Sequence, residues 1–219
     1  MRIDLHMHTL LSDGELLPIE LARRCAVKGH KAIAFTDHVA LSTLDRVLDE
    51  ASKDIPLAKE WNLEVLNGVE ITHVPAKKID MVVSKARQHG AQIIVIHGET
   101  ISEPVEKGTN LAAVSNPEID ILAHPGFITV EEAELAKKNG VALEITSRSS
   151  HNKTNGHVAR IARQVGAKMV LDSDTHSPGD IIDEQTAMII ARAAGLTDEE
   201  AHRACYETME EIVKRRSQY

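Results

Sequence analysis

The sequence is poor in aromatic residues and cysteine, and it has no long apolar run. Aromatic residues make up 2% of the 219 residues, which argues against a surface that stacks unpaired bases. The two cysteines, Cys25 and Cys205, form no CxxC pair, so both are expected to be reduced structural residues. No apolar stretch is long enough to span a bilayer, and no signal-peptide core follows the first methionine. We therefore expect no membrane association and a cytoplasmic location.

The charge balance is acidic, with a formal net charge of -8 when histidine is neutral. Because nucleic-acid binding requires a positive surface, this balance argues against a polynucleotide as a partner, although it leaves room for a local basic pocket. The first predicted strand is not followed by a glycine-rich GxGxxG or P-loop turn. That absence weakens the interpretation as an open nucleotide-binding sheet.

Apolar runs and helical stretches alternate along the chain, with no linker, repeat or low-complexity segment between them. The pattern predicts seven strands, at 2–6, 32–36, 63–69, 92–96, 119–123, 141–145 and 168–172. Helices are predicted at 18–28, 43–60, 75–89, 130–139, 156–165, 183–194 and 198–216. Strands separated by helices pair in parallel. We therefore predict an α/β fold, a distorted TIM-like (β/α)7 barrel.

Histidine is abundant in this sequence: the chain has 12, and six of them follow short apolar runs. His6 and His8 lie two residues apart on a strand, so their side chains point to the same side. Asp174 and His176 repeat this spacing after the last strand, which neighbours the first strand in a closed barrel. The other candidate ligands also lie at a strand end or in the turn after it: Asp13, His38, Glu70, His97 and His124. The pattern predicts one metal site at the C-terminal end of the strands, and its mixed ligands favour Zn, Mn or Fe over Mg.

The ordered set of motifs resembles the PHP (polymerase and histidinol phosphatase) superfamily of metal-dependent phosphoesterases. The resemblance is carried by His-Met-His at 6–8, Ser-Asp-Gly at 12–14, Thr-Asp-His at 36–38, Gly-Val-Glu at 68–70, His97, Ala-His-Pro at 123–125 and Ser-Asp-Thr-His at 173–176. Each motif is weak alone, but together they cover the chain in order. The resemblance implies one PHP domain over residues 1–219, similar to the stand-alone histidinol phosphatases.

The resemblance also implies a site for two to three divalent ions. One ion would take His6, His8, Glu70 and Asp174; a second would take Glu70, His97 and His124, with Glu70 bridging; a third would take Asp13, His38 and His176. No ligand of this set is missing from the sequence. A complete set argues against a degenerate scaffold, the form that this fold takes in some polymerase and RNase P subunits.

The function that follows is hydrolysis of a phosphomonoester, with a small phosphorylated metabolite such as histidinol phosphate as the substrate. We expect a hydroxide that bridges two ions to attack phosphorus, since adjacent ions lower the pKa of a bound water. In this hypothesis Glu70 is the bridging carboxylate, and Asp13 or Asp174 could protonate the leaving group. Arg148 follows the sixth predicted strand, where a guanidinium can hold a phosphate through two hydrogen bonds.

Several nearby residues are assigned supporting roles. Lys153 and His151, in the same loop as Arg148, are candidates for substrate binding. Glu144 ends the sixth predicted strand and could orient a ligand or Arg148. Asp37 is expected to support a ligand rather than to be one. The remaining histidines fall on helices or helix edges, where surface or capping roles are expected: His30, His73, His89, His157 and His202.

Other functions stay open at this point. A phosphodiesterase or 3′–5′ exonuclease acting on nucleotides or short oligonucleotides would use the same site. Related metal barrels hydrolyse C–N or C–O bonds, as amidohydrolases do, and fold does not settle the reaction. The non-enzymatic alternative is a metal-stabilised subunit of a larger complex. The last two predicted helices could cover the barrel or form a dimer face, so a homo-oligomer also stays open.

Overall fold

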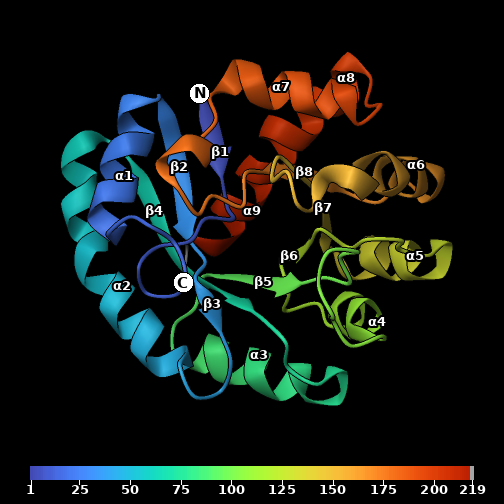
Figure 1. The fold of residues 1–219 in the computed structure, drawn as a ribbon, viewed down its shortest axis with the longest axis horizontal. Helices are drawn as coiled ribbons and strands as arrows, with labels where there is room; N and C mark the ends of the chain where they lie inside the picture. Colours follow the sequence, from blue (N-terminus) through green and yellow to red (C-terminus); the bar gives the residue numbers. More distant parts are fainter. Residues whose placement is uncertain (218–219) are drawn as a thin grey trace.

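A parallel sheet surrounded by helices forms the frame of the protein in the computed structural model, which describes residues 1–217 (Figure 1). Its strands run in the order β1 (Arg2–Asp4), β2 (His30–Phe35), β4 (Glu64–Ile71), β5 (Ile93–His97), β6 (Ile121–Ala123), β7 (Ala142–Thr146) and β8 (Met169–Asp172). A two-residue strand, β3 (His38–Val39), pairs with β4 beside this path. All seven predicted strands are therefore present, and they pair in parallel as predicted.

The first and last strands close the barrel at one end only. Met7 and Thr175, just beyond β1 and β8, form a single parallel bridge. Deeper in the barrel a side chain replaces strand pairing, because the amide of Leu5 donates to Asp172 Oδ1 at 2.6 Å. The predicted (β/α)7 barrel is confirmed, and its distortion lies at this seam between β1 and β8.

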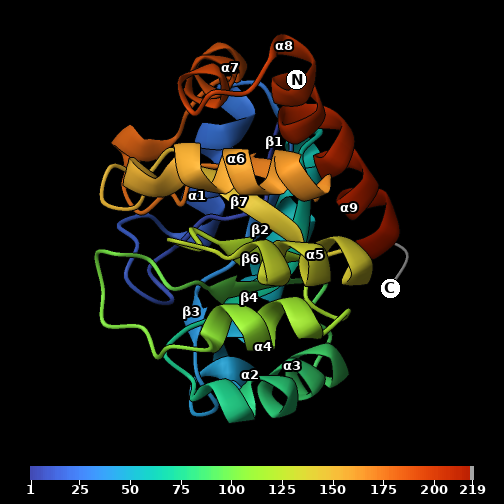
Figure 2. The same cartoon turned by 90° about the vertical axis from the view of Figure 1, so that its right-hand side faces the viewer.

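Helices cover the outside of the strands and one end of the barrel. The outer helices are α1 (Pro18–Val27), α2 (Leu44–Ala58), α3 (Ile79–Gln88), α4 (Thr109–Ser115), α5 (Val130–Asn139), α6 (Asn155–Val165) and α7 (Glu184–Ala193). A last segment comprises α8 (Asp198–His202), a π-helical turn at Arg203–Glu207, and α9 (Thr208–Arg216). Figure 2 shows α9 on the side of the barrel opposite the loops that follow the strands.

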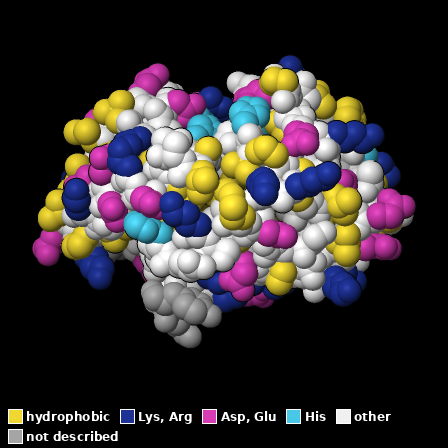
Figure 3. All heavy atoms as spheres, turned by 90° about the horizontal axis from the view of Figure 1, so that it is seen from below, with side chains coloured by type: hydrophobic (Ala, Val, Ile, Leu, Met, Phe, Trp, Pro, Cys, Tyr) yellow, Lys and Arg dark blue, Asp and Glu magenta, His cyan; other side chains and the backbone are white. Residues whose placement is uncertain are grey.

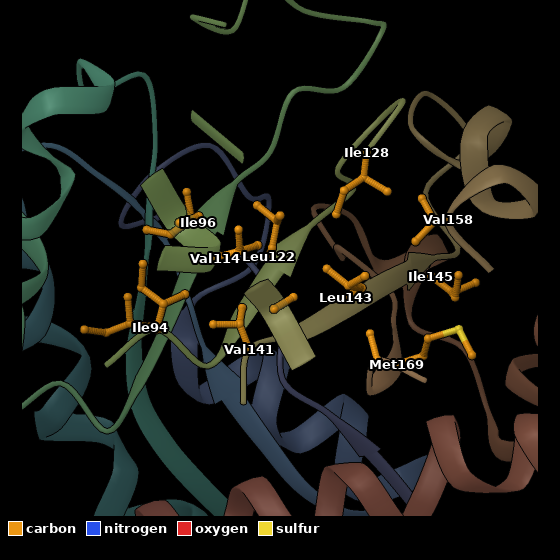
Figure 4. Packing of buried hydrophobic residues seen from close by; sticks show 14 of the residues in the cluster. Ile94, Ile96, Val114, Leu122, Ile128, Val141, Leu143, Ile145, Val158 and Met169 are labelled. Carbon is orange, nitrogen blue, oxygen red and sulfur yellow. The ribbon is translucent and has the colours of Figure 1, made fainter. Parts of the chain in front are cut away.

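Alternation along the strands divides the apolar core into layers. Ile93 and Val95 of β5 belong to the cluster inside the barrel, which Met209 and Ile212 of α9 also join. The intervening Ile94 and Ile96 point the other way and pack beneath the helices, together with Leu122, Leu143 and Ile145 (Figure 4). This period of two leaves both faces of the sheet buried. Helix α9 thus closes the floor of the barrel, and the other end stays open.

The predicted helices are present, with three differences. Helix α4 and strand β3 were not predicted, because elements this short carry too little periodicity to recognise. The predicted helix 198–216 is interrupted by the π-helical turn. The sequence pattern does not reveal this turn, because its buried residues Ala204 and Cys205 continue the apolar face of the helix. Thr197 is the N-cap of α8, and its side chain accepts the amide hydrogen of Glu200 at 3.2 Å. In the part of the chain that the structure describes, no helix has the length and apolarity needed to cross a bilayer.

Candidate metal centre

Loops that follow the strands enclose a cavity of about 430 Å³ at the open end of the barrel. Figure 3 shows this end at its upper edge, where histidine side chains lie in a hollow between acidic groups. Six of the nine predicted ligands line the cavity, and the other three are buried beneath it: His6, His8 and Glu70. The parallel topology brings all nine together, because every strand ends at the same mouth.

Glu70 lies at the centre of the site. Its Oε2 atom is 3.2 Å from His6 Nε2 and 3.3 Å from His8 Nε2, and its Oε1 atom is 3.6 Å from His124 Nε2. Both oxygens of Glu70 and the Nε2 atoms of His6 and His8 are buried and make no hydrogen bond. Such unpaired buried polar atoms are costly, and a cation among them would satisfy them. The residues present therefore fit divalent metal ions.

The ligand atoms form four overlapping groups, in each of which all atoms lie within 4.8 Å of one another. The groups are His6, His8 and Glu70; Glu70, His97 and His124; His6, His124 and Asp174; and His8, Asp13, His38 and His176. Glu70 belongs to two of them, whereas Asp174, which the resemblance places with His6, His8 and Glu70, falls in a group with His6 and His124. The structure adds His8 to the third implied set.

The electrostatics of the site shift the pKa values of its histidines in opposite directions. Burial alone would raise the pKa of Glu70, but the positive charges of His6 and His38 outweigh it and hold that pKa well below its usual range. Burial and neighbouring histidines lower the pKa values of His8 and His124 far below that of free histidine. An ionised Glu70 and neutral His8 and His124 are in the forms that bind metals. Burial opposes protonation of His6 and His38, but nearby carboxylates raise the pKa values of both, so these two rings must lose a proton when an ion binds.

A surrounding shell fixes the orientation of the ligands. The Nδ1 atom of His6 lies 2.6 Å from Glu144 Oε1, while the other oxygen of Glu144 accepts the amide hydrogen of His124 at 2.8 Å. Glu144 therefore orients a ligand, one of the two roles considered for it. Asp37 accepts hydrogen bonds from Thr9 and Ser12, so it holds the loop that carries Asp13 and is not itself a ligand in any of the four groups.

Two of the predicted ligands occupy strained backbone conformations. His124 has φ 27° and Asp174 has φ 52°, and these positive values lie in the left-handed region of backbone conformations that residues other than glycine rarely adopt. Backbone strain of this kind costs about 1–3 kcal/mol per residue and concentrates at functional sites. The turn after His97 is equally constrained, because a Cβ on Gly98 would lie 2.2 Å from the carbonyl oxygen of Ala123.

The three predicted substrate residues lie in different environments. Arg148 lines the cavity, with Nε 3.6 Å from Asp174 Oδ2. His151 is buried, and its ring stacks on that of His124 with centroids 4.3 Å apart. Lys153 is exposed on the 3-10 turn Asn152–Thr154 and does not line the cavity. The structure thus brings Arg148 and His151, but not Lys153, to the site.

Two site residues were missed or misplaced by the sequence analysis. Glu103, in the loop after β5, has Oε2 3.1 Å from His97 Nε2 and Oε1 3.4 Å from His151 Nε2. His73 is exposed, as expected, but it also lines the same cavity, with Nε2 3.6 Å from Glu103 Oε2. His30 was likewise expected at the surface but is buried, and burial lowers its pKa to about 4. No local signal marks these residues, because loop contacts and strand packing position them.

The whole chain matches one protein family. The model of RNase P subunit p30 covers residues 1–218. The chain belongs to the RNase P subunit p30 family. This family is part of the PHP-like group of TIM-type barrels, so the resemblance to the PHP superfamily is confirmed.

Individual relatives carry different names. An uncharacterised protein of Methanocaldococcus jannaschii is 46% identical over 217 residues, which covers 98% of this chain and 100% of that protein. A "probable phosphatase" of Caldanaerobacter subterraneus is 29% identical, covering 82% of this chain and 78% of that protein. The DNA polymerase/3′–5′ exonuclease PolX of Bacillus subtilis is 29% identical, but the match covers 86% of this chain and only 36% of the enzyme. The relatives thus support a phosphoesterase-like function.

A solved chain of archaeal ribonuclease P with mature tRNA has the same fold, with a TM-score of 0.74 and 21% identity over 99% of this chain and 92% of that chain. With the family, this structure corrects one expectation. The argument from net charge against a polynucleotide partner is wrong, because the family is that of a ribonuclease P subunit. Net charge is a sum over the whole surface, and it does not exclude contact through one face.

Proposed function

We propose that the protein is a metal-dependent phosphoesterase that hydrolyses a small phosphomonoester. The observation that carries the proposal is the convergence of buried, unpaired ligand atoms on Glu70, with a guanidinium beside them. A binding scaffold does not need such costly groups at the mouth of the barrel. The phosphatase-named relative supports the same class of reaction.

Each part of the site has a task in this reaction. Divalent ions, when bound, supply an activated water and offset the charge of the phosphoryl oxygens. Glu70, with His6 and His8 on one side and His97 and His124 on the other, would help to hold these ions, and Glu144 would keep the His6 ring in place. Arg148 would hold the phosphoryl group in line by hydrogen bonds from its guanidinium. The water oxygen forms the new P–O bond, the ester P–O bond breaks, and the departing alcohol takes up a proton.

A subunit role is the second candidate, and family membership favours it. The family is named for a subunit of ribonuclease P, so this chain could assemble with other subunits on an RNA. The complete ligand set favours the enzymatic proposal, since a scaffold has no use for nine converging ligands. The similarity to PolX, which is named as an exonuclease, makes cleavage of phosphodiester bonds in nucleotides another outcome to be tested.

The test is a hydrolysis assay on protein stripped of metal and reloaded with Mn, Zn, Fe or Mg. Phosphomonoesters, including histidinol phosphate, are compared with the diester bis(p-nitrophenyl) phosphate. We expect metal-dependent release of inorganic phosphate from a monoester. Cleavage of the diester alone would overturn the monoester assignment in favour of nucleotide chemistry. Tight metal binding by elemental analysis without any hydrolysis would support the subunit role.

A further inference from the structure

A second cavity, of about 520 Å³, adjoins the metal cavity, and Arg148 and His176 line both. Five serines line this second cavity, which we call the serine cavity, together with the carboxylates of Glu15 and Asp180. Its volume lies in the range of small-molecule sites. Its only large apolar side chains are Ile182 and Ile190.

Arg148 forms the wall between the two cavities. Its Nε atom lies 3.6 Å from Asp174 Oδ2 on the metal side, and its Nη1 atom lies 3.8 Å from Asp180 Oδ2 on the serine side. The backbone behind it is fixed, since the amides of His151 and Asn152 both donate to the Arg148 carbonyl. A phosphoryl group held by this guanidinium over the metal ligands therefore leaves the rest of the ester beside the serine cavity.

The serine cavity offers hydrogen-bonding groups that the protein does not use itself. Within residues 1–217, the side-chain hydroxyls of Ser149 and Ser150 make no hydrogen bond, whereas Ser173 and Ser177 bond to Thr175 and Asp180. Hydroxyl groups both donate and accept, and the carboxylate of Glu15, for which residues 1–217 supply no hydrogen bond, accepts strongly from an alcohol. The unused groups are thus complementary to several hydroxyls on one ligand.

We propose that the serine cavity is the leaving-group subsite of the phosphoesterase and takes a polyhydroxylated alcohol, so that the substrate is a sugar or polyol monophosphate. This inference rests on the proposed function. Glu15 and Asp180 repel a second phosphate on the same ligand. The scarcity of apolar lining gives an aromatic leaving group little surface to bury. The subsite therefore selects monophosphates of hydroxyl-rich alcohols over aryl phosphates and bisphosphates.

The test measures binding to the Mn-loaded protein by calorimetry. The probes are the phosphonate analogue of ribose 5-phosphate, whose P–C bond is not hydrolysed, and benzylphosphonate. We expect wild-type protein to bind the ribose analogue at least about tenfold more tightly. In the double variant Ser149→Ala/Ser150→Ala the affinity for the ribose analogue should fall about tenfold, the cost of one or two hydrogen bonds, with less than about twofold change for benzylphosphonate. Unchanged benzylphosphonate affinity shows that the variant is folded.

A matched control replaces two distant exposed serines, Ser52→Ala/Ser84→Ala on α2 and α3, and should bind both probes as the wild type does. Equal affinity of the wild type for both probes, or equal losses for both in the serine-cavity variant, would overturn the subsite. Hydrolysis of ribose 5-phosphate and phenyl phosphate is measured in parallel. Selective binding without hydrolysis would refute the proposed function alone, whereas hydrolysis without selectivity would refute only the subsite.

Discussion

Asp172 in β8 accepts the amide hydrogen of Leu5, the residue directly after β1, at 2.6 Å, and this contact joins the two ends of the barrel where regular strand pairing is absent. The carboxyl group is fully buried, and its second oxygen makes no hydrogen bond. Burial, together with the nearby carboxyl groups of Asp4 and Glu144, raises the pKa of Asp172 well above its usual value. The seam of the barrel therefore depends on an acid that is costly to ionise.

Replacement of Asp172 tests this seam. Asp172→Ala leaves the Leu5 amide unpaired and should lower the free energy of unfolding by about 2 kcal/mol. Asp172→Asn keeps an acceptor and serves as the matched control. An acid with a raised folded-state pKa weakens the fold as pH rises above its usual pKa, so the stability of Asp172→Asn relative to wild type should increase from pH 4 upward. Urea unfolding at several pH values measures both effects, and equal stability of the two variants would contradict the role of Asp172.

Removal of bound metal should destabilise the protein. The buried oxygens of Glu70 and the Nε2 atoms of His6 and His8 make no hydrogen bond, so they lose the partner that an ion supplies when the ion leaves. At a free metal concentration about 100 times the dissociation constant, binding adds about 2.7 kcal/mol. For a chain of this size, chelation should therefore lower Tm by about 5–10 °C, and added Mn or Zn should restore it. An identical melting curve with and without chelator would refute a metal centre here.

Glu70→Gln should abolish both turnover and full metal occupancy. An amide has the same shape but lacks the charge that a carboxylate between two ions supplies. Phosphate release should fall at least about a hundredfold, and elemental analysis should show fewer bound ions. Glu64→Gln, at the exposed start of the same strand, is the control and should match the wild type. Full activity of metal-replete Glu70→Gln would show that Glu70 does not bridge.

Glu103→Gln should change the stability of the metal-free protein in a pH-dependent manner. Hydrogen bonding to His97 lowers the pKa of Glu103 to about 2. The pKa of His97 is raised: burial opposes this, but Glu103 and Glu70 outweigh it. Because the pKa of Glu103 is lowered in the folded protein, its pairing stabilises the fold above about pH 4.5, and this stabilisation is lost as the pH falls towards 2. Because the pKa of His97 is raised, its pairing stabilises the fold below about pH 6.5, and this stabilisation is lost at higher pH.

The stability difference between wild type and Glu103→Gln should therefore be largest near pH 5 and shrink on either side. Thermal unfolding in chelator across this pH range measures it. Glu134→Gln, an exposed substitution on α5, should show no such maximum. A difference that is constant with pH would mean that Glu103 does not pair with His97 in solution.

Arg148→Lys should weaken substrate binding more than the chemical step. Lysine keeps the charge but cannot donate two parallel hydrogen bonds, and the loss of one charge-assisted bond corresponds to about a tenfold or larger increase in KM. Steady-state kinetics with a phosphomonoester checks this. Arg160→Lys, exposed on α6, is the matched control. An unchanged KM in Arg148→Lys would remove Arg148 from substrate binding.

Predictions from the sequence agree with the structure where a local pattern of residues could be combined with a rule of strand topology. His97 and His124 end apolar runs, and parallel strands all end at one mouth, so their convergence follows without knowledge of any loop. The family resemblance added the expectation that several of these ligands group around Glu70. By contrast, Lys153 shares a loop with Arg148 but does not line the cavity, because the 3-10 turn directs it to solvent. Position in a loop did not predict the direction of a side chain.

The barrel and its candidate metal ligands follow from local sequence patterns, because the period of two in the strands and the helices between them allow few other arrangements. The contacts between these residues and their neighbours depend on the folded chain instead. Glu103 reaches His97 because its loop is tied across the mouth, where Ser102 donates to the Ser150 carbonyl. Asp172 closes the seam 167 residues from Leu5. Such contacts depend on loop paths and on packing between distant segments, which no local periodicity encodes.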